Sequence, residues 1–231
     1  MHSNPASFSS AHKTYTSLTL MTFPDIDILR LRYLRGPNVW TYRPVIEAWV
    51  NLGPLEDHPS HTLPGFVDRL NAWLPGMVEH RCGIGERGGF LQRLDEGTWC
   101  GHIMEHVAIE LQTLAGMQVG FGKARETSQR GIYKVVIRTR QEEVGIESMI
   151  AARDLVMAAI NDTPFDLKGT VSRLKSMVDR LCLGPSTACI VDAATEHRIP
   201  SIRLTSGNLV QLGYGSLQRR IWTAETDRTS A

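Results

Sequence analysis

Apolar residues recur every three or four positions between Gly97 and Gly116, which is the period of an amphipathic helix. Thr98 is a residue type that favours the N-cap of a helix, and Gly116 can end one in the left-handed conformation. The other face of this predicted helix holds acids and histidines but no Lys or Arg, unlike an ordinary solvated face. The predicted apolar face consists of Ile103, Met104, Val107, Ala108, Leu111, Leu114 and Ala115.

Two strands and a short helix are predicted before this central helix. Residues 26–34 alternate apolar and basic side chains, and residues 45–50 are mostly apolar. We expect these two strands to pair across a turn at residues 35–38. Pro64 suits the first turn of a helix of about ten residues, because the missing N–H of proline costs nothing there.

After the central helix, the pattern predicts strands at residues 119–122 and 132–140, with a polar loop at residues 123–131 between them. Two helices follow, at residues 147–161 and 165–181. Strands, helices, strands and helices in this order are typical of an α+β domain. We therefore predict a mainly antiparallel sheet whose helices pack on one face.

The predicted α+β domain covers residues 23–162. Residues 163–231 have a different character: a linker helix, a second helix at residues 184–196, and three short strand-like segments. The spacing of that second helix and the next strand is typical of an α/β unit. Residues 163–231 are therefore predicted to be a linker helix and the truncated start of a second, incomplete α/β domain.

Composition narrows the class of protein. The 231 residues are 42% hydrophobic, and 25 basic and 24 acidic residues give a formal charge of +1, which argues against a nucleic acid partner. No apolar run reaches the roughly 18 residues of a membrane span, so no membrane association is expected. Residues 1–22 are predicted to be a disordered leader. The four cysteines form no C-x-x-C pair and indicate reduced thiols in a cytoplasmic protein.

The polar face of the central helix carries a candidate metal site. His102, Glu105 and His106 form H-x-x-E-H, in which two imidazoles can hold zinc and the acid, here Glu105, can accept a proton from water. Glu110 is the predicted third ligand. Alternative ligands are Glu79 and His80, and the soft thiols Cys82 and Cys100. An equally simple interpretation is two hydrogen-bonded histidines without a metal.

Several stretches beyond this motif resemble the cyanophycin synthetases, which make a storage polymer with a poly-aspartate backbone that carries arginine on its side chains. The resemblance runs from residue 34 to the end of the chain. It lies in residues 34–40, Glu79-His80, Gly88-Gly89-Phe90-Leu91, residues 96–122, residues 184–187, residues 210–215 and residues 218–221.

The resemblance implies an N-terminal domain followed by the entry to an ATP-grasp ligase, which adds aspartate in that family. A Mur-ligase-like domain adds arginine. The sequence contains no complete ATP-grasp core and no P-loop, so we do not expect this chain to ligate by itself, and ATP and Mg are expected only for a full-length enzyme. Partners would be the polymer and a full-length synthetase, or a second copy in a homo-oligomer. A non-functional truncated gene product is an alternative.

Two functions remain open at this stage. The chain is either a module that binds the zwitterionic polymer, with Arg87, Arg93 and Arg125 as candidates for its carboxylates, or a zinc-dependent peptidase that trims the polymer. Both activities can coexist. Ordinary solvated charge explains each arginine taken singly. A stand-alone inverzincin-like peptidase that acts on other peptides is the alternative outside the family.

Overall fold

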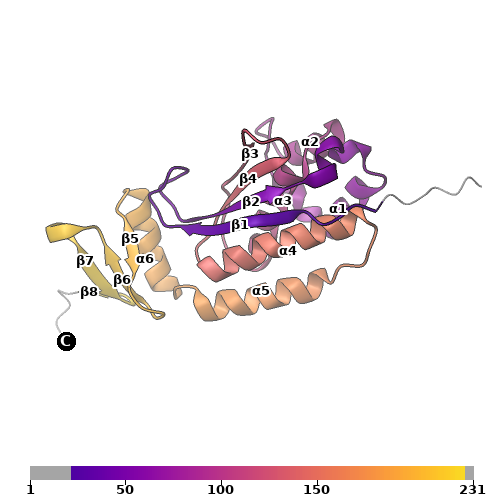
Figure 1. Cartoon of the computed structure of the whole chain (residues 1–231). Coiled ribbons are helices and arrows are strands. Elements are labelled where there is room, and N and C mark those ends of the chain that lie inside the picture. Colours follow the sequence, from indigo (N-terminus) through magenta and orange to yellow (C-terminus); the bar gives the residue numbers. More distant parts are fainter. Residues whose placement is uncertain (1–21, 227–231) are drawn as a thin grey trace, which may run out of the picture.

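The computed structural model describes residues 22–226, which contain two antiparallel four-stranded sheets and six α-helices (Figure 1). This arrangement confirms the predicted α+β class with mainly antiparallel sheets. The predicted leader at residues 1–22 lies almost entirely outside the described residues. Among the described helices, none is long and apolar enough to span a membrane.

The first sheet has the strand order β1-β2-β4-β3, and every neighbouring pair is antiparallel. Ile46, Ala48 and Val50 project from one face of the sheet together with Val135 and Ile137, and this face meets the hydrophobic core. The predicted pairing of the first two strands is confirmed. The strands are β1 (Asp27–Leu34), β2 (Val45–Asn51), β3 (Gly122–Glu126) and β4 (Ile132–Arg138).

In the part of the chain that the structure describes, helices cover one face of the first sheet, the face that meets the core. The central helix α3 packs on β3 and β4 and lies beside α4, which in turn packs on α5 (Figure 1). The shorter helix α1 packs on α4, and α2 packs on the 3-10 helices at Ser60–Thr62 and Pro75–Glu79. Their bounds are α1 (Phe66–Trp73), α2 (Gly89–Glu96), α3 (Cys100–Leu114), α4 (Glu142–Ile160) and α5 (Leu167–Leu181), with 3-10 helices at Gly53–Asp57, Ser60–Thr62 and Pro75–Glu79.

The predicted central helix is confirmed, but its start differs from expectation. Trp99 is the N-cap residue and makes no side-chain cap, so the prediction for Thr98 was wrong. The Thr98 hydroxyl instead contacts His102 Nδ1 at 2.8 Å. The polar face is not solvated, because Glu105, His106 and Glu110 are all buried.

Two other element boundaries were predicted wrongly. The polar residues 123–126 belong to β3, which pairs only with β4 and therefore needs no alternating apolar residues. Helix α4 begins five residues before the predicted position 147, at Glu142, because the Gln141 side chain caps it by accepting a hydrogen bond from the Glu143 N–H at 2.6 Å.

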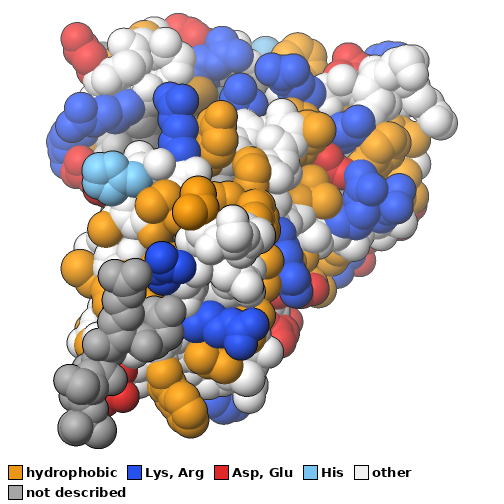
Figure 2. Space-filling model, turned by 90° about the vertical axis from the view of Figure 1, so that its left-hand side faces the viewer, with side chains coloured by type: hydrophobic (Ala, Val, Ile, Leu, Met, Phe, Trp, Pro, Cys, Tyr) orange, Lys and Arg blue, Asp and Glu red, His pale blue; other side chains and the backbone are white. Residues whose placement is uncertain are grey.

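The C-terminal part consists of α6 (Pro185–Glu196) and the second sheet, in which β5 to β8 pair in sequence order. An ion pair between Arg140 and Asp192 at 2.8 Å joins it to the rest of the chain. Exposed hydrophobic side chains occur here, including Leu217 and Trp222. Seen from this end, hydrophobic side chains lie at the surface among Lys and Arg (Figure 2). The strands are β5 (Ser201–Arg203), β6 (Leu209–Leu212), β7 (Arg219–Trp222) and β8 (Glu225–Thr226), with a 3-10 helix at Gly215–Leu217.

Candidate metal centre and basic sheet face

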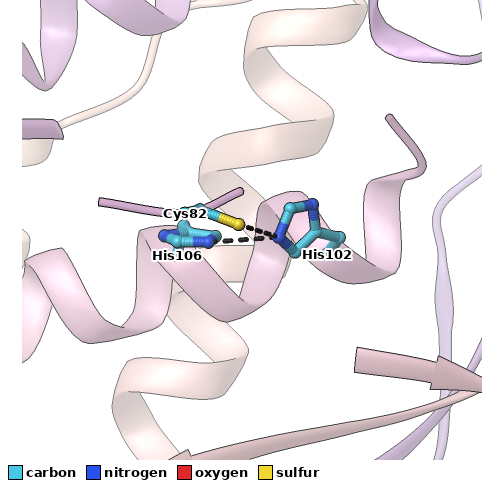
Figure 3. Close-up of side chains that lie close together, drawn as sticks. All are labelled: Cys82, His102 and His106. Carbon is cyan, nitrogen blue, oxygen red and sulfur yellow. Dashed lines mark hydrogen bonds between the residues drawn. The ribbon is translucent and has the colours of Figure 1, made fainter. Parts of the chain in front are cut away.

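Helix α3 presents two histidines, one turn apart, toward a cysteine from the preceding loop (Figure 3). His102 Nε2 lies 3.1 Å from His106 Nε2 and 3.2 Å from Cys82 Sγ. All three ligand atoms lie within 4.8 Å of one another. Nitrogen and sulfur atoms so arranged can hold a metal ion. We call these three residues the His–Cys cluster.

The glycine-rich loop brings Cys82 to the cluster. Gly83, Gly85 and Gly88 all have positive φ, so the loop turns back on itself. The Gly88 N–H donates to Val78 O at 2.7 Å, and the Phe90 N–H donates to His80 O at 3.1 Å. These bonds tie the two ends of the loop together and place residues 80–82 beside α3.

A second layer of polar groups surrounds the cluster. His106 Nδ1 lies 2.7 Å from His80 Nδ1, and His80 Nε2 lies 3.0 Å from Glu110 Oε2. On the other side, the Thr98 hydroxyl contacts His102 Nδ1. Both histidines of the cluster therefore use Nδ1 for a protein partner and direct Nε2 toward each other.

Burial favours the neutral forms of the three side chains of the cluster. The Phe90 ring stacks on the His106 ring with centroids 3.9 Å apart. Burial, with a smaller effect of the Arg93 charge, lowers the pKa of His102 to about 4. Burial also lowers the pKa of His106, and it raises the pKa of the Cys82 thiol. Neutral imidazoles with free lone pairs are the form in which histidine binds metals.

The donor set fits zinc. Two nitrogens that each lie about 2.1 Å from a zinc ion stand about 3.4 Å apart at the tetrahedral angle, close to the observed separation. Without an ion, one of the two facing Nε2 atoms has to carry a proton. With an ion between them, both can offer lone pairs.

Glu105 is not one of the three clustered residues, although its charge lies close enough to Cys82 to add to the effect of burial in raising the pKa of that thiol. The Glu105 side chain lies against Gly122 of β3, where any larger residue would collide with it. Burial raises the pKa of this carboxyl to about 8. No hydrogen bond to the carboxyl group is found among the described residues. The motif therefore supplies its two histidines to one site and its acid to the α3–β3 contact.

The other candidate ligands occupy different positions. Glu110 approaches the cluster only through His80, and its carboxylate lies against Gly76 with no room for a side chain at residue 76. Glu79 is exposed and pairs with Arg87 at 2.8 Å. Cys100 is fully buried, which raises the pKa of its thiol to about 12, and it is not one of the three clustered ligands. Thr98, which was predicted to be the N-cap residue of α3, instead contacts the cluster through His102.

The candidate polymer-binding arginines lie in two places. Arg87 and Arg93 belong to the glycine-rich loop and α2, near the cluster, and Arg93 has a half-exposed side chain 3.9 Å from Glu96. Arg125 lies on the face of the first sheet that no helix covers, with its guanidinium 5.9 Å from the centre of the Trp40 ring.

This uncovered face is rich in basic side chains. Arg30, Trp49, Lys134 and Arg125 are successive cross-strand partners and so form one row on the same face. Arg32, Glu47, Val136 and Lys123 form the adjacent row in the same way. We call Arg30, Arg32, Lys123, Arg125 and Lys134, together with Trp49, the basic face.

The one acid in these two rows is fully engaged. Glu47 pairs with Arg32, and it also accepts hydrogen bonds from Trp40 Nε1 at 2.9 Å and Trp49 Nε1 at 3.2 Å. Lys134 lies directly opposite Arg125 in the sheet and 4.6 Å from the centre of the Trp49 ring. The sequence could not show this face, because its residues come from four separate strands.

A surface cavity lies elsewhere, at the C-terminal end of α3. It has a volume of about 630 Å³ and is lined by Thr113, Gly116, Met117, Gln118, Val119, Gly120 and Arg138. It therefore touches neither the His–Cys cluster nor the basic face as defined above.

Residues 47–161 match the model of the cyanophycin synthase-like N-terminal domain, a span that includes the His–Cys cluster. The cyanophycin synthetase of Geminocystis herdmanii is 42% identical over 207 residues, which cover 87% of this chain and 24% of that protein. The chain belongs to the cyanophycin synthetase family. The cyanophycin synthetases of Crocosphaera subtropica and a Synechocystis species are each 44% identical over 199 residues, 84% of this chain and 23% of the relative.

The chain spans about a quarter of the length of the cyanophycin synthetases it matches. The likeness covers 87% of this chain and so extends beyond the N-terminal domain match into the C-terminal part.

Proposed function

We propose that this chain is a polymer-binding domain of the cyanophycin synthetase type, and that the basic face holds the polymer. The observation that carries this proposal is the concentration of five basic residues and Trp49 in two adjacent rows of one uncovered sheet face. ATP-dependent addition of Asp and Arg is proposed only for a full-length enzyme. Family membership supports an Asp–Arg polymer as the ligand.

Charge on this face is not a consequence of composition. The whole chain has nearly equal numbers of acidic and basic residues, yet Lys134 and Arg125 face each other without an acid between them. Like charges directly opposite in a sheet are destabilising. An anionic ligand would relieve this repulsion, and solvent and salt relieve it only in part.

The chemistry of the face suits a zwitterionic polymer. Arg and Lys side chains can bind the free carboxylates of arginine units through charge-assisted hydrogen bonds. The rings of Trp40 and Trp49 each lie within cation–π distance of a basic side chain, Arg125 and Lys134. Guanidinium groups of the polymer can make the same kind of cation–π contact with these rings. The face therefore offers contacts to both charged groups of the polymer.

Co-sedimentation of the chain with insoluble polymer tests this proposal. The double variant Arg125→Ala/Lys134→Ala should bind the polymer about tenfold more weakly or worse, because two charged contacts are removed. A factor of ten in affinity corresponds to about 1.4 kcal/mol. The matched control is Lys168→Ala/Lys175→Ala, which removes two exposed lysines from α5. Equal binding by the double variant and the wild type would overturn the proposal.

A second candidate function is metal-dependent cleavage of the polymer, and the His–Cys cluster favours it. In this proposal Cys82, His102 and His106 hold the zinc ion, which when bound would supply Lewis acidity toward a peptide carbonyl. Glu105 would move the proton. The Glu105 side chain packs against Gly122, and its charge lies close enough to Cys82 to influence the pKa of that thiol, which supports a role beside the cluster.

Metal analysis and a cleavage assay test this second candidate. The purified chain should contain stoichiometric zinc, and Glu105→Gln should keep the metal but lose cleavage by two orders of magnitude or more. Glu79→Gln is the matched control, since Glu79 is exposed and pairs with Arg87. A zinc-free protein, or cleavage that Glu105→Gln leaves unchanged, would contradict it.

A further inference from the structure

Strand β3 is an open edge of the first sheet. In the described part of the chain it pairs with β4 on one side, with no shift of register, and no strand lies on its other side. A strand at the edge of a sheet presents unpaired N–H and C=O groups. Such groups can pair with another extended chain, and this is a known mode of peptide recognition.

The direction of each backbone group of β3 follows from the two hydrogen bonds that flank the strand. The Arg138 N–H donates to Phe121 O at 2.8 Å, and the Thr127 N–H donates to Ile132 O at 2.8 Å. Because hydrogen-bonded residues alternate in an antiparallel pair, every second residue from Phe121 to Thr127 directs its backbone groups toward β4. The residues between them direct theirs outward, and these are Gly122, Ala124 and Glu126.

The other sheet edges in residues 22–226 are less suited to pairing. The register of β1 shifts between Ile28 and Arg30, and the Leu29 side chain is exposed at this irregularity. A bulge of this kind interrupts the regular spacing of backbone groups that an added strand requires. At the edges of the second sheet, β5 has three residues and β8 has two. Strand β3 has five residues and no interruption.

The two faces of the β3 edge carry opposite charges. Successive side chains of a strand alternate between faces, so Lys123 and Arg125 lie on the basic face and Glu126 lies on the other. All three side chains are exposed. A second copy of β3 paired at this edge would bring like charges together, which is unfavourable. A chain whose side chains each end in a carboxylate and a guanidinium complements both faces.

We propose that the Asp–Arg polymer binds β3 by strand addition, with an extended segment of its backbone paired to Gly122, Ala124 and Glu126. This inference rests on the polymer binding proposed above and adds main-chain contacts to it. The main-chain hydrogen bonds supply affinity that does not depend on charge. Lys123 and Arg125 then bind carboxylates of the polymer side chains that lie over the basic face.

A proline at position 124 tests the strand addition. Ala124→Pro removes an outward N–H and places the proline ring at the edge, while the hydrogen bonds between β3 and β4 are kept, which is why edge strands tolerate proline. The variant keeps every charge, yet it should bind a soluble Asp–Arg oligomer about tenfold more weakly or worse in titration calorimetry. Ala124→Ser keeps the N–H and is the matched control, which should bind as the wild type does. Thermal melting shows whether each variant is folded.

Amide hydrogen exchange of the wild-type chain gives a second test that does not depend on the folding of a variant. Read by NMR at each residue, the amides of Gly122, Ala124 and Glu126 should exchange about tenfold more slowly, or slower still, when the oligomer is bound at saturation. The amide of Thr127 already donates to Ile132 O and is the internal reference, which should change little.

The possible outcomes are distinct. A folded Ala124→Pro variant that binds like the wild type, or outward amides that exchange equally fast with the oligomer bound, would overturn the strand addition. The proposed binding to the basic face would survive that result, because it fails only if Arg125→Ala/Lys134→Ala binds like the wild type. Slow exchange of the outward amides that needs a high chain concentration and no oligomer would assign the edge to a second copy, and would also overturn the inference.

Discussion

Glu47 illustrates how a single buried acid organises the basic face. Its carboxylate is almost fully buried and is held by Arg32 and the indole N–H groups of Trp40 and Trp49. Burial alone would raise its pKa, but these hydrogen bonds outweigh burial, so the pKa of Glu47 lies below the ordinary value of 4.5. The ionised form therefore stabilises the fold.

We expect Glu47→Gln to lower the free energy of unfolding by about 2 kcal/mol at pH 7, because a charged, hydrogen-bonded partner is lost. A depressed folded-state pKa gives stability that is present above the unfolded pKa and is lost as the pH falls through the folded pKa. The difference between variant and wild type should therefore shrink below about pH 4. Urea unfolding at pH 7 and pH 3 measures it, and an equal difference at both values would contradict the assignment.

The sequence predicted which two histidines lie together, but it did not predict what the neighbouring acids contact. The H-x-x-E-H spacing correctly brought His102 and His106 to one point, since residues four apart share a helix face. It could not show that Glu110 reaches the cluster only through His80, or that Glu105 turns toward β3. Those positions depend on the loop and strand packed against α3. The ligand assignments themselves remain predictions.

At the scale of elements, segments with a strong apolar period were predicted correctly. The polar edge strand and the polar start of a helix were not. Helix α3 and strand β4 were predicted because their apolar positions meet the core. Strand β3 was missed because an edge strand with polar side chains has no apolar signal. The first turn of α4 was missed because its polar cap residues precede the apolar pattern.

The contact between α4 and the first sheet gives a prediction at this scale. A Cβ atom on Gly145 would lie 2.6 Å from Ile46 Cγ1 and 2.8 Å from Thr139 Cβ, and both of those residues are buried. Gly145→Ala should therefore separate the helix from the sheet and cost about 1–3 kcal/mol, even though alanine favours helices. Thermal unfolding measures the change. Unchanged or higher stability would show that α4 can shift freely.

At the scale of the whole molecule, sheet pairing creates features that neither composition nor motifs reveal. The formal charge of +1 argued correctly against a strongly basic protein, yet antiparallel pairing gathers basic residues from β1, β3 and β4 on one face. Of the three arginines predicted to bind polymer, Arg125 lies there, and Arg87 and Arg93 lie by the His–Cys cluster. The two candidate sites thus use different surfaces of one domain.

The most direct test of the central claim is lysine footprinting by mass spectrometry, with and without polymer. Lys123 and Lys134 belong to the basic face, whereas Lys168 and Lys175 lie on α5 and serve as internal controls. Saturating polymer should slow amine labelling of Lys123 and Lys134 severalfold and leave Lys168 and Lys175 unchanged. Unchanged labelling of Lys123 and Lys134, with polymer demonstrably bound, would contradict the account.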